Sequence, residues 1–283
     1  MKLIQPSVTI VEQKDIFEHI ENCARTCYKS EPKGDAKGFV NRLIKSHHTA
    51  MLEHGTVYLD IPLGSPMDDP DYLSKSSIIL FFKSNEYSKV NEYVEWVVNI
   101  ATINHFAITT NLRVIQEQFQ NTTFADNVEI NKFICQPTEH HEKRITARII
   151  TDRGVSHELV RHRKFSFAQE STRFCNYSKT RFGNELAFIE PSWWDQASPD
   201  SKNIFIDSIQ TAEECYLELI KNNWTPQQAR QVLPNAIKTE IVMTGFESDW
   251  DYFFRLRLNG ETGAPHPDMK KIAGMLKKSL EKD

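Results

Sequence analysis

Apolar residues recur along this chain with helical spacing in some segments and with alternation in others. The clearest helical pattern covers residues 201–223. Its apolar stripe consists of Ile204, Ile209, Ala212, Tyr216, Leu219 and Ile220. Further helices are predicted over residues 15–30 with Asp15 as N-cap, over 38–55 with an end near Gly55, and over 247–259. Shorter helical patterns cover residues 110–120, the residues after Gly154, and 225–234.

Strands are predicted where β-branched and aromatic residues gather or alternate with polar ones. These segments are residues 1–12, 56–63, 77–84, 93–110, 145–152 and 237–246. Residues 186–194 are also expected to be extended, and residues 64–75, rich in Pro, Asp and Gly, to form a loop. Helices and strands mix without regular β-α-β alternation, which predicts an α+β fold.

The chain of 283 residues is long enough to bury a substantial core. Neither an internal repeat nor a linker is visible, so we expect one domain over residues 1–283. No run approaches the eighteen or so apolar residues that a membrane span requires. The first residues lack the pattern of a signal peptide. We therefore expect a cytoplasmic protein without a membrane partner.

The five cysteines are scattered and include no C-x-x-C pair. This argues against a disulfide framework and against a structural zinc site. The pair His140–His141, flanked by Glu139 and Glu142, is compatible with a metal site or with a solvated turn. The charged composition favours the turn.

The formal net charge is −4, which is unusual for a protein that coats nucleic acid. Cations nevertheless concentrate in residues 161–173, together with two serines and a threonine. Guanidinium groups match phosphate oxygens, and hydroxyls add donors. A polar loop after Arg163 would suit a phosphate monoester. A solvated helix face and a nucleic-acid contact remain alternatives for this segment.

A small anion needs several such groups, because one charge-assisted hydrogen bond contributes about 1.5–3 kcal/mol. Micromolar binding requires about 8 kcal/mol. Arg230 and Arg257 are two later arginines that we expect to join the segment. Aromatic residues surround Arg257 in the sequence, and a dry environment would strengthen its field.

The pattern R-H-R-x-x-S-x-x-x-x-S-x-R over residues 161–173 resembles the signature of flavin-dependent thymidylate synthases. Four further elements resemble the same family in the expected order. They are Cys23 to Tyr28, His48 with Glu53-His54, Ala229 to Pro234, and Leu256-Arg257. The resemblance thus extends over most of the chain, with residues 63–145 interpreted as an insertion within the single catalytic domain.

The resemblance implies mixed helices with an antiparallel sheet, and a homotetramer with active sites at subunit interfaces. It implies methylation of dUMP to dTMP, with FAD as cofactor, NADPH as reductant and methylene-tetrahydrofolate as one-carbon donor. The implied flavin contacts are His48, Arg161, His162, Arg163 and Gln169. The implied dUMP contacts are Glu158, Arg161, Gln169, Glu170, Ser171, Thr172, Arg173, Arg230 and Arg257. Arg257 is the expected catalytic residue, because it would stabilise negative charge on the base. No metal and no nucleic acid are implied.

The sequence departs from the family pattern at Ala168-Gln169, where Asn-Glu is usual, and at Phe246, where an asparagine is usual. No flavin contact is assigned to Phe246. The Pro-Cys-His-Gln motif of thymidylate synthases that use a cysteine nucleophile is missing. Cys175 is the one alternative nucleophile, but no partner base is evident from its spacing. We therefore expect a reaction without a cysteine nucleophile. Since no G-x-G-x-x-G or P-loop occurs, side chains rather than a Rossmann crevice must hold the dinucleotide.

Overall fold

The computed structural model describes residues 1–97, 101–122, 129–183 and 185–281. The chain divides into two compact units. The first unit comprises residues 1–12, 21–35 and 145–283, and the second comprises residues 13–20 and 36–144. Helix α1 (Ile16–Thr26) contributes residues to both. Asp15 caps this helix as predicted, because its Oδ1 accepts hydrogen bonds from the amides of Phe17 and Glu18, each at 2.9 Å.

The second unit ends close to the end of the predicted insertion but begins well before it. The insertion was placed at residues 63–145, whereas the main segment of the second unit covers residues 36–144. The interpretation of residues 1–283 as one catalytic domain with an insertion stays a prediction.

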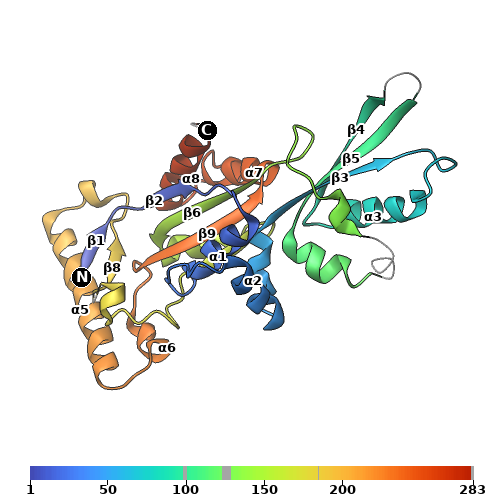
Figure 1. The fold of residues 1–283 in the computed structure, drawn as a ribbon. Helices are drawn as coiled ribbons and strands as arrows, with labels where there is room; N and C mark the ends of the chain where they lie inside the picture. Colours follow the sequence, from blue (N-terminus) through green and yellow to red (C-terminus); the bar gives the residue numbers. More distant parts are fainter. Residues whose placement is uncertain (98–100, 123–128, 184, 282–283) are drawn as a thin grey trace. The chain divides into compact units, whose positions relative to one another are not determined.

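The first unit is built on a four-stranded sheet in the order β2-β6-β9-β7 (Figure 1). Its strands are β2 (Ser7–Ile10), β6 (Arg144–Asp152), β9 (Lys238–Phe246) and β7 (Ser166–Gln169). The pairs β2–β6 and β7–β9 are antiparallel. A separate parallel pair joins β1 (Lys2–Ile4) to β8 (Ala187–Ile189). This mixture of helices and antiparallel strands confirms the predicted α+β class.

Two C-terminal helices provide half of the buried apolar side chains in the core of this sheet. Helix α7 (Glu247–Arg257) contributes Trp250, Phe253 and Phe254, and α8 (Pro267–Leu280) contributes Met269, Ile272 and Leu276. They pack with strand residues such as Ile149 and Met243. Burying one such side chain stabilises the fold by roughly 1.5–3 kcal/mol. The last turn of α7 is therefore held firmly against the unit.

The long helix α5 (Pro199–Lys221) matches the predicted segment closely, but its apolar stripe differs in one place. Ile209 and Tyr216 are buried as expected, whereas Ile204 is 70% exposed. Phe205 and Ile206 pack against the core of this region instead. The predicted short helix after Thr225 is also present, as α6 (Pro226–Ala229) followed by a 3-10 turn at Arg230–Val232. No helix within the described residues is long and apolar enough to cross a membrane.

The second unit contains a three-stranded antiparallel sheet in the order β3-β5-β4 (Figure 1). Its strands are β3 (Thr56–Leu63), β5 (Ala101–Asn111) and β4 (Lys89–Val97). The strand predicted over residues 93–110 is thus two strands, and residues 98–100 within it lie outside the described residues. Helix α3 (Tyr72–Ser84) packs against β3 and β4.

Helix α3 corrects the strand predicted over residues 77–84. Ile78, Ile79 and Phe82 are buried at helical spacing, whereas Leu80 is 66% exposed. A short apolar run fits a buried strand and one face of a helix equally well, and here tertiary packing selects the helix. The first residues of α3, 72–75, were predicted to belong to the loop at 64–75.

The helix predicted over residues 38–55 is two elements. Helix α2 (Ala36–Lys45) ends before His47, whose φ of 56° does not continue a right-handed helix. A 3-10 helix, Thr49–His54, follows. The predicted helix at residues 110–120 is present as a π-helical segment, Val114–Phe119. A 3-10 helix also covers Ile130–Phe133.

The His140–His141 pair lies in a turn as expected, but His141 is not solvated. It is 6% exposed, and its Nε2 lies 3.0 Å from the carbonyl oxygen of Leu59. Its Nδ1 accepts a hydrogen bond from the amide of Thr138 at 3.1 Å. His141 therefore has a structural role in the second unit.

Candidate functional site

Helix α4 (Arg153–Leu159), the turn that follows it and helix α7 bring together three of the predicted site residues. The Arg257 Nη1 donates a hydrogen bond to Glu158 Oε2 at 2.9 Å, and its Nη2 donates to the Glu158 carbonyl oxygen at 3.3 Å. The Arg257 Nε donates to His162 Nε2 at 2.9 Å. All the nitrogens of this guanidinium are thus directed by the fold, and the group is partly buried, with 22% of the side chain exposed.

His162 is neutral in this arrangement. Arg257 does not release its proton, so the Nε2 of His162 must present a lone pair and its Nδ1 must carry the proton. The ring is 8% exposed and packs edge-on against Phe253, with 4.9 Å between centroids. Burial, followed by the charge of Arg257, lowers the pKa of His162 to about 4. The trio therefore holds one cation, one carboxylate and one neutral acceptor at neutral pH.

The chain turns sharply between α4 and β7, and a glycine allows this turn to pack closely. Phe165 is 7% exposed, and its ring lies against Gly245 of β9. A Cβ at residue 245 would overlap the Cδ1 and Cε1 atoms of that ring. Because Gly245 has no side chain, Phe165 and with it the turn at residues 160–165 can pack closely against β9.

Two arginines of this turn remain available for a ligand. Arg161 and Arg163 are exposed. Within the described part of the chain, neither side chain has a hydrogen bond or ion pair with another residue. Their neighbour Lys164 lies 3.8 Å from Asp249. Arg161 and Arg163 therefore flank the buried His162 as two cations facing solvent.

The segment after this turn is not the continuous polar loop that was expected. Its first part is strand β7, whose backbone pairs with β9 from Ser166 to Gln169. The Gln169 side-chain amide donates to Ser156 Oγ at 2.8 Å and to Thr239 Oγ1 at 3.1 Å. The Glu170 amide still donates to the Glu240 carbonyl oxygen of β9 at 2.8 Å, so only the part from Ser171 onward leaves the sheet. Pairing with β9 thus removes several of the backbone donors that a phosphate loop was predicted to expose.

Glu170 lies in a buried ionic network. Its side chain is 1% exposed and forms an ion pair with Lys238, while its Oε1 accepts a hydrogen bond from Tyr177 at 2.7 Å. Lys238 also lies 3.7 Å from Glu240. This satisfied arrangement gives Glu170 a role in holding the segment that follows it. Lys238 and Tyr177 were not predicted from the sequence, because nothing in their sequence context marks them as partners of Glu170.

Ser171, Thr172 and Arg173 form the turn after β7. The Ser171 amide donates to the Cys27 carbonyl oxygen at 3.0 Å, and Thr172 is buried. Arg173 is exposed, and its Nε donates to Gln227 Oε1 at 2.6 Å. Gln227 belongs to α6, and Arg230 follows it in the next turn. The structure thus attaches Arg173 to the short helix that precedes Arg230.

Arg230 is exposed, and within the described residues its side chain has no hydrogen bond or ion pair. The helix before it is fixed by a capping box between Thr225 and Gln228. His48 lies in the second unit, exposed, immediately before the 3-10 helix Thr49–His54. Of the predicted site residues, the structure therefore groups Glu158, His162 and Arg257, and places Arg173 beside the α6 segment.

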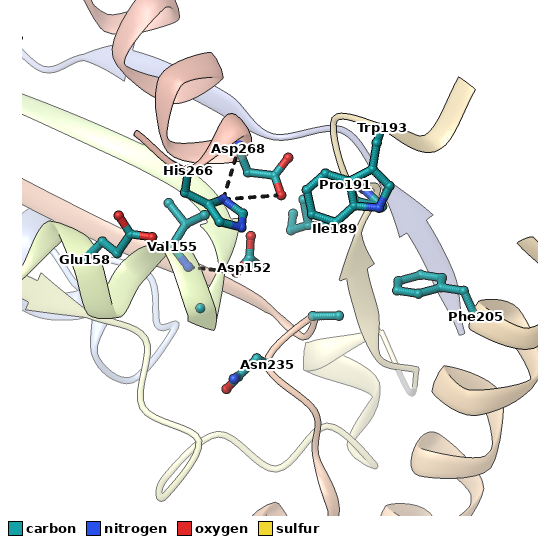
Figure 2. Close-up of a pocket in the computed structure, with 12 residues that line it drawn as sticks. Asp152, Val155, Glu158, Ile189, Pro191, Trp193, Phe205, Asn235, His266 and Asp268 are labelled. Carbon is teal, nitrogen blue, oxygen red and sulfur yellow. Dashed lines mark hydrogen bonds and ion pairs between the residues drawn. The ribbon is translucent and has the colours of Figure 1, made fainter. Parts of the chain in front are cut away.

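A cavity of about 350 Å³ lies alongside α4 (Figure 2). Its lining includes three carboxylates, from Asp152, Glu158 and Asp268, and two aromatic rings, from Trp193 and Phe205. Burial, followed by a smaller effect of Asp268, raises the pKa of Asp152. Carboxylates repel a phosphate, so this cavity does not suit a nucleotide phosphate. Glu158 is the only predicted site residue among those that line it.

The cavity was not predicted from the sequence. Asp152 caps α4 by accepting a hydrogen bond from the Val155 amide at 2.8 Å, and Asp268 begins α8 beside His266. These residues are distant in the sequence and carry no shared motif. Within the described residues, no group of three or more His, Cys, Asp or Glu side chains is arranged to hold a metal ion.

Residues 120–282 match the sequence profile of the family described as thymidylate synthase complementing protein. This match covers more than half of the chain, and the chain belongs to that family. The matched region, residues 120–282, includes every predicted site residue except His48.

Individual relatives are similar over a shorter region. A flavin-dependent thymidylate synthase of Mycobacterium tuberculosis is 32% identical over 120 residues, covering 37% of this chain and 45% of the relative. One of Corynebacterium efficiens is 36% identical over 114 residues, with the same two coverages. The chain therefore spans less than half the length of the relatives it matches.

A solved structure that matches this chain is a UMP/dUMP methylase, PolB, from Streptomyces cacaoi, bound with 5-Br dUMP. Its sequence is 15% identical to this chain, and the match covers 100% of this chain and 93% of PolB. The TM-score is 0.44.

Proposed function

We propose that this chain is a flavin-dependent enzyme that methylates dUMP to dTMP. Methylene-tetrahydrofolate is the proposed one-carbon donor and NADPH the proposed reductant. The observation that carries the proposal is that Arg257 donates hydrogen bonds to Glu158 and His162. These bonds join the R-H-R motif to an arginine about a hundred residues later in the sequence. Family membership and the names of the relatives support the same activity.

Arg257 stabilises negative charge that develops on the uracil ring. Its guanidinium is partly buried, and its orientation is set before any ligand arrives. Such preorganised charge is often the largest contribution to catalysis. Because His162 is neutral, it adds no second positive charge beside Arg257 and acts as an acceptor that directs the Nε.

The phosphate of dUMP is assigned to Arg173 and Arg230, with Ser171 and Thr172 beside them. Arg173 is already attached to the helix before Arg230, and Arg230 has an unpaired guanidinium within the described residues. Glu158, Arg161, Gln169 and Glu170 complete the proposed dUMP contacts. Two guanidinium forks supply the several charge-assisted hydrogen bonds that a phosphate monoester needs.

The residues present fit an anionic flavin nucleotide. Arg161 and Arg163 are exposed cations without protein partners in the described chain, which suits the diphosphate of FAD. His48, His162 and Gln169 are the remaining proposed contacts. When bound, FAD supplies the redox chemistry of the reaction.

Four of the five thiols of this chain support a mechanism without a cysteine nucleophile. Burial raises the pKa of Cys23 to about 12 and that of Cys175 to about 11. Burial also raises the pKa values of Cys27 and Cys135. The thiolate is the nucleophilic form, so these four groups are poor nucleophiles at neutral pH.

The test is reconstitution of the purified protein with FAD, followed by a dTMP assay. We expect a bound-flavin absorption spectrum, and dTMP only when dUMP, methylene-tetrahydrofolate and NADPH are all present. A protein that does not bind FAD, or that oxidises NADPH without forming dTMP, would refute the proposal. Size-exclusion chromatography with light scattering tests the proposed homotetramer, whose mass is four times 32.8 kDa.

A further inference from the structure

In the second unit, the 3-10 helix Thr49–His54 is tied at both ends to the chain that follows β5. At its start, the Thr49 hydroxyl donates a hydrogen bond to Glu117 Oε1. Near its end, Glu53 Oε1 accepts one from Arg113 Nη1 at 2.5 Å. The Arg113 Nε also donates to Glu117 Oε2 at 2.6 Å. One guanidinium therefore connects the two anchoring points of this helix.

Hydrogen bonds stabilise the charged forms of Arg113 and Glu117 in this network. The Thr49 hydroxyl, followed by Arg113, lowers the pKa of Glu117. The hydrogen bond with Glu117 is the largest cause that raises the pKa of Arg113. The Arg113 and Glu117 side chains are each 35% exposed, and that of Glu53 is 20% exposed. A single exposed ion pair contributes little, but a forked guanidinium between two carboxylates also fixes direction.

The residues around Arg113 give the network a rigid base. The Val114 amide donates to Asn111 Oδ1 at 3.0 Å, at the end of β5. Val114, Ile115 and Phe119 of the π-helical segment are buried in the core of the second unit. π-Helical turns are rare and occur frequently at functional sites. Arg113 and Glu117 therefore extend from a well-packed part of the second unit to the short 3-10 helix Thr49–His54.

We propose that Arg113, together with Glu117, is a positioning residue that fixes His48 for flavin binding. This inference rests on the proposed function, in which His48 contacts the flavin. His48 is exposed and directly precedes Thr49, so the orientation of its backbone depends on how that first helical residue is anchored. Arg113 and Glu117 lie within the predicted insertion, residues 63–145, so the proposal gives part of that segment a role in flavin binding.

The test is a double-mutant cycle on FAD affinity with Arg113→Gln, His48→Gln and the double variant. We expect each single variant to weaken FAD binding by roughly tenfold and the double variant to match His48→Gln alone, because coupled residues are not additive. Lys132→Gln is the control, since it removes another ion pair of the same unit, that with Asp71 at 3.4 Å. It should leave FAD affinity unchanged. If the two fold-losses of FAD affinity multiply in the double variant, the residues act independently and the inference is overturned.

Hydrogen exchange separates this inference from the proposed function. Amides of residues 48–54 should exchange faster in Arg113→Gln than in Lys132→Gln, with or without FAD. If the unmodified protein binds no FAD, both the proposed function and the role of Arg113 in flavin binding are refuted. Faster amide exchange in Arg113→Gln would then show only that Arg113 stabilises the 3-10 helix. If FAD binds but both affinity and exchange are unchanged in Arg113→Gln, the positioning role fails and the proposed function stands.

Discussion

At the scale of single residues, the chemistry of His162 is set by its surroundings rather than by its sequence context. The ring is buried beside Arg257 and accepts a hydrogen bond from it, which disfavours protonation. An isolated imidazole titrates at 6.5, whereas the pKa of His162 is lowered to about 4. Because this pKa differs between the unfolded and the folded chain, the free energy of unfolding depends on pH.

We therefore predict that the folded state loses stability as the pH falls from about 6.5 to about 4. In this range the unfolded chain takes up a proton at His162 while the folded chain does not, so acid favours unfolding. The contribution is fully present above pH 6.5. His162→Gln retains an acceptor for Arg257 but cannot titrate, so its unfolding free energy should fall less over the same range. Urea titrations at several pH values measure this, and parallel losses in both proteins would contradict it.

Arg257 gives the sharpest test of catalysis. Arg257→Ala should lower kcat by roughly 10²–10³, because a preorganised charge is lost at the base. The matched control is Arg255→Ala on the same helix. Arg255 is 58% exposed and pairs with Glu261 at the surface, so kcat should not change. Initial rates of dTMP formation measure both variants. An undiminished kcat in Arg257→Ala would remove this residue from the mechanism.

At the scale of elements, Gly245 shows how one strand residue fixes the R-H-R turn. Gly245→Ala should destabilise the protein by about 1–3 kcal/mol, because a Cβ would overlap the packed ring of Phe165. Gly274→Ala in α8 is the control. A Cβ there meets only Leu258 Cδ1 at 3.7 Å, so the substitution should stabilise the helix by about 0.5–1 kcal/mol. Denaturant midpoints check both signs, and equal effects would contradict the steric explanation.

Several elements were predictable because their signals are local. Asp15 marks the start of α1, and the Pro226 to Pro234 segment gives a short helix. Helix α3 was not predictable, because Ile78, Ile79 and Phe82 suit a strand equally well until packing is known. The break at His47 depends on one left-handed residue. Local patterns therefore identified most elements but not every type or boundary.

The candidate site was predictable only in part, for a related reason. The R-H-R signature and the arginines at 230 and 257 are visible in the sequence. The pairing of Glu158 with Arg257 joins residues 99 positions apart, and the buried pair of Glu170 with Lys238 joins residues 68 apart. Such pairs follow from how β7, β9 and α7 pack. The sequence thus predicted a set of candidate side chains but not which of them neutralise one another.

At the scale of the whole molecule, the proposed function requires an acidic chain to bind an anionic substrate. The net charge of −4 gives no general attraction, so binding depends on a few local arginines. Arg173→Ala should weaken dUMP binding by about 10- to 100-fold, the loss of one charge-assisted hydrogen bond. Lys179→Ala removes an exposed cation from the same segment and should bind dUMP normally. Calorimetric titration measures both, and an unchanged Kd in Arg173→Ala would place the phosphate elsewhere.

The final prediction concerns assembly. In one chain, Arg173 is held by Gln227 of α6, whereas Arg257 is held by Glu158 of α4, and the cavity of about 350 Å³ is lined by neither arginine. The proposed homotetramer has its active sites at subunit interfaces, so we expect the two arginines of one site to come from different subunits. We predict that co-expressed Arg173→Ala and Arg257→Ala chains, purified through two different tags, recover dTMP synthesis that each variant lacks alone. Mixed oligomers contain some sites with both arginines intact if the two come from different subunits. Mixed oligomers as inactive as their parents would show that one chain supplies both residues.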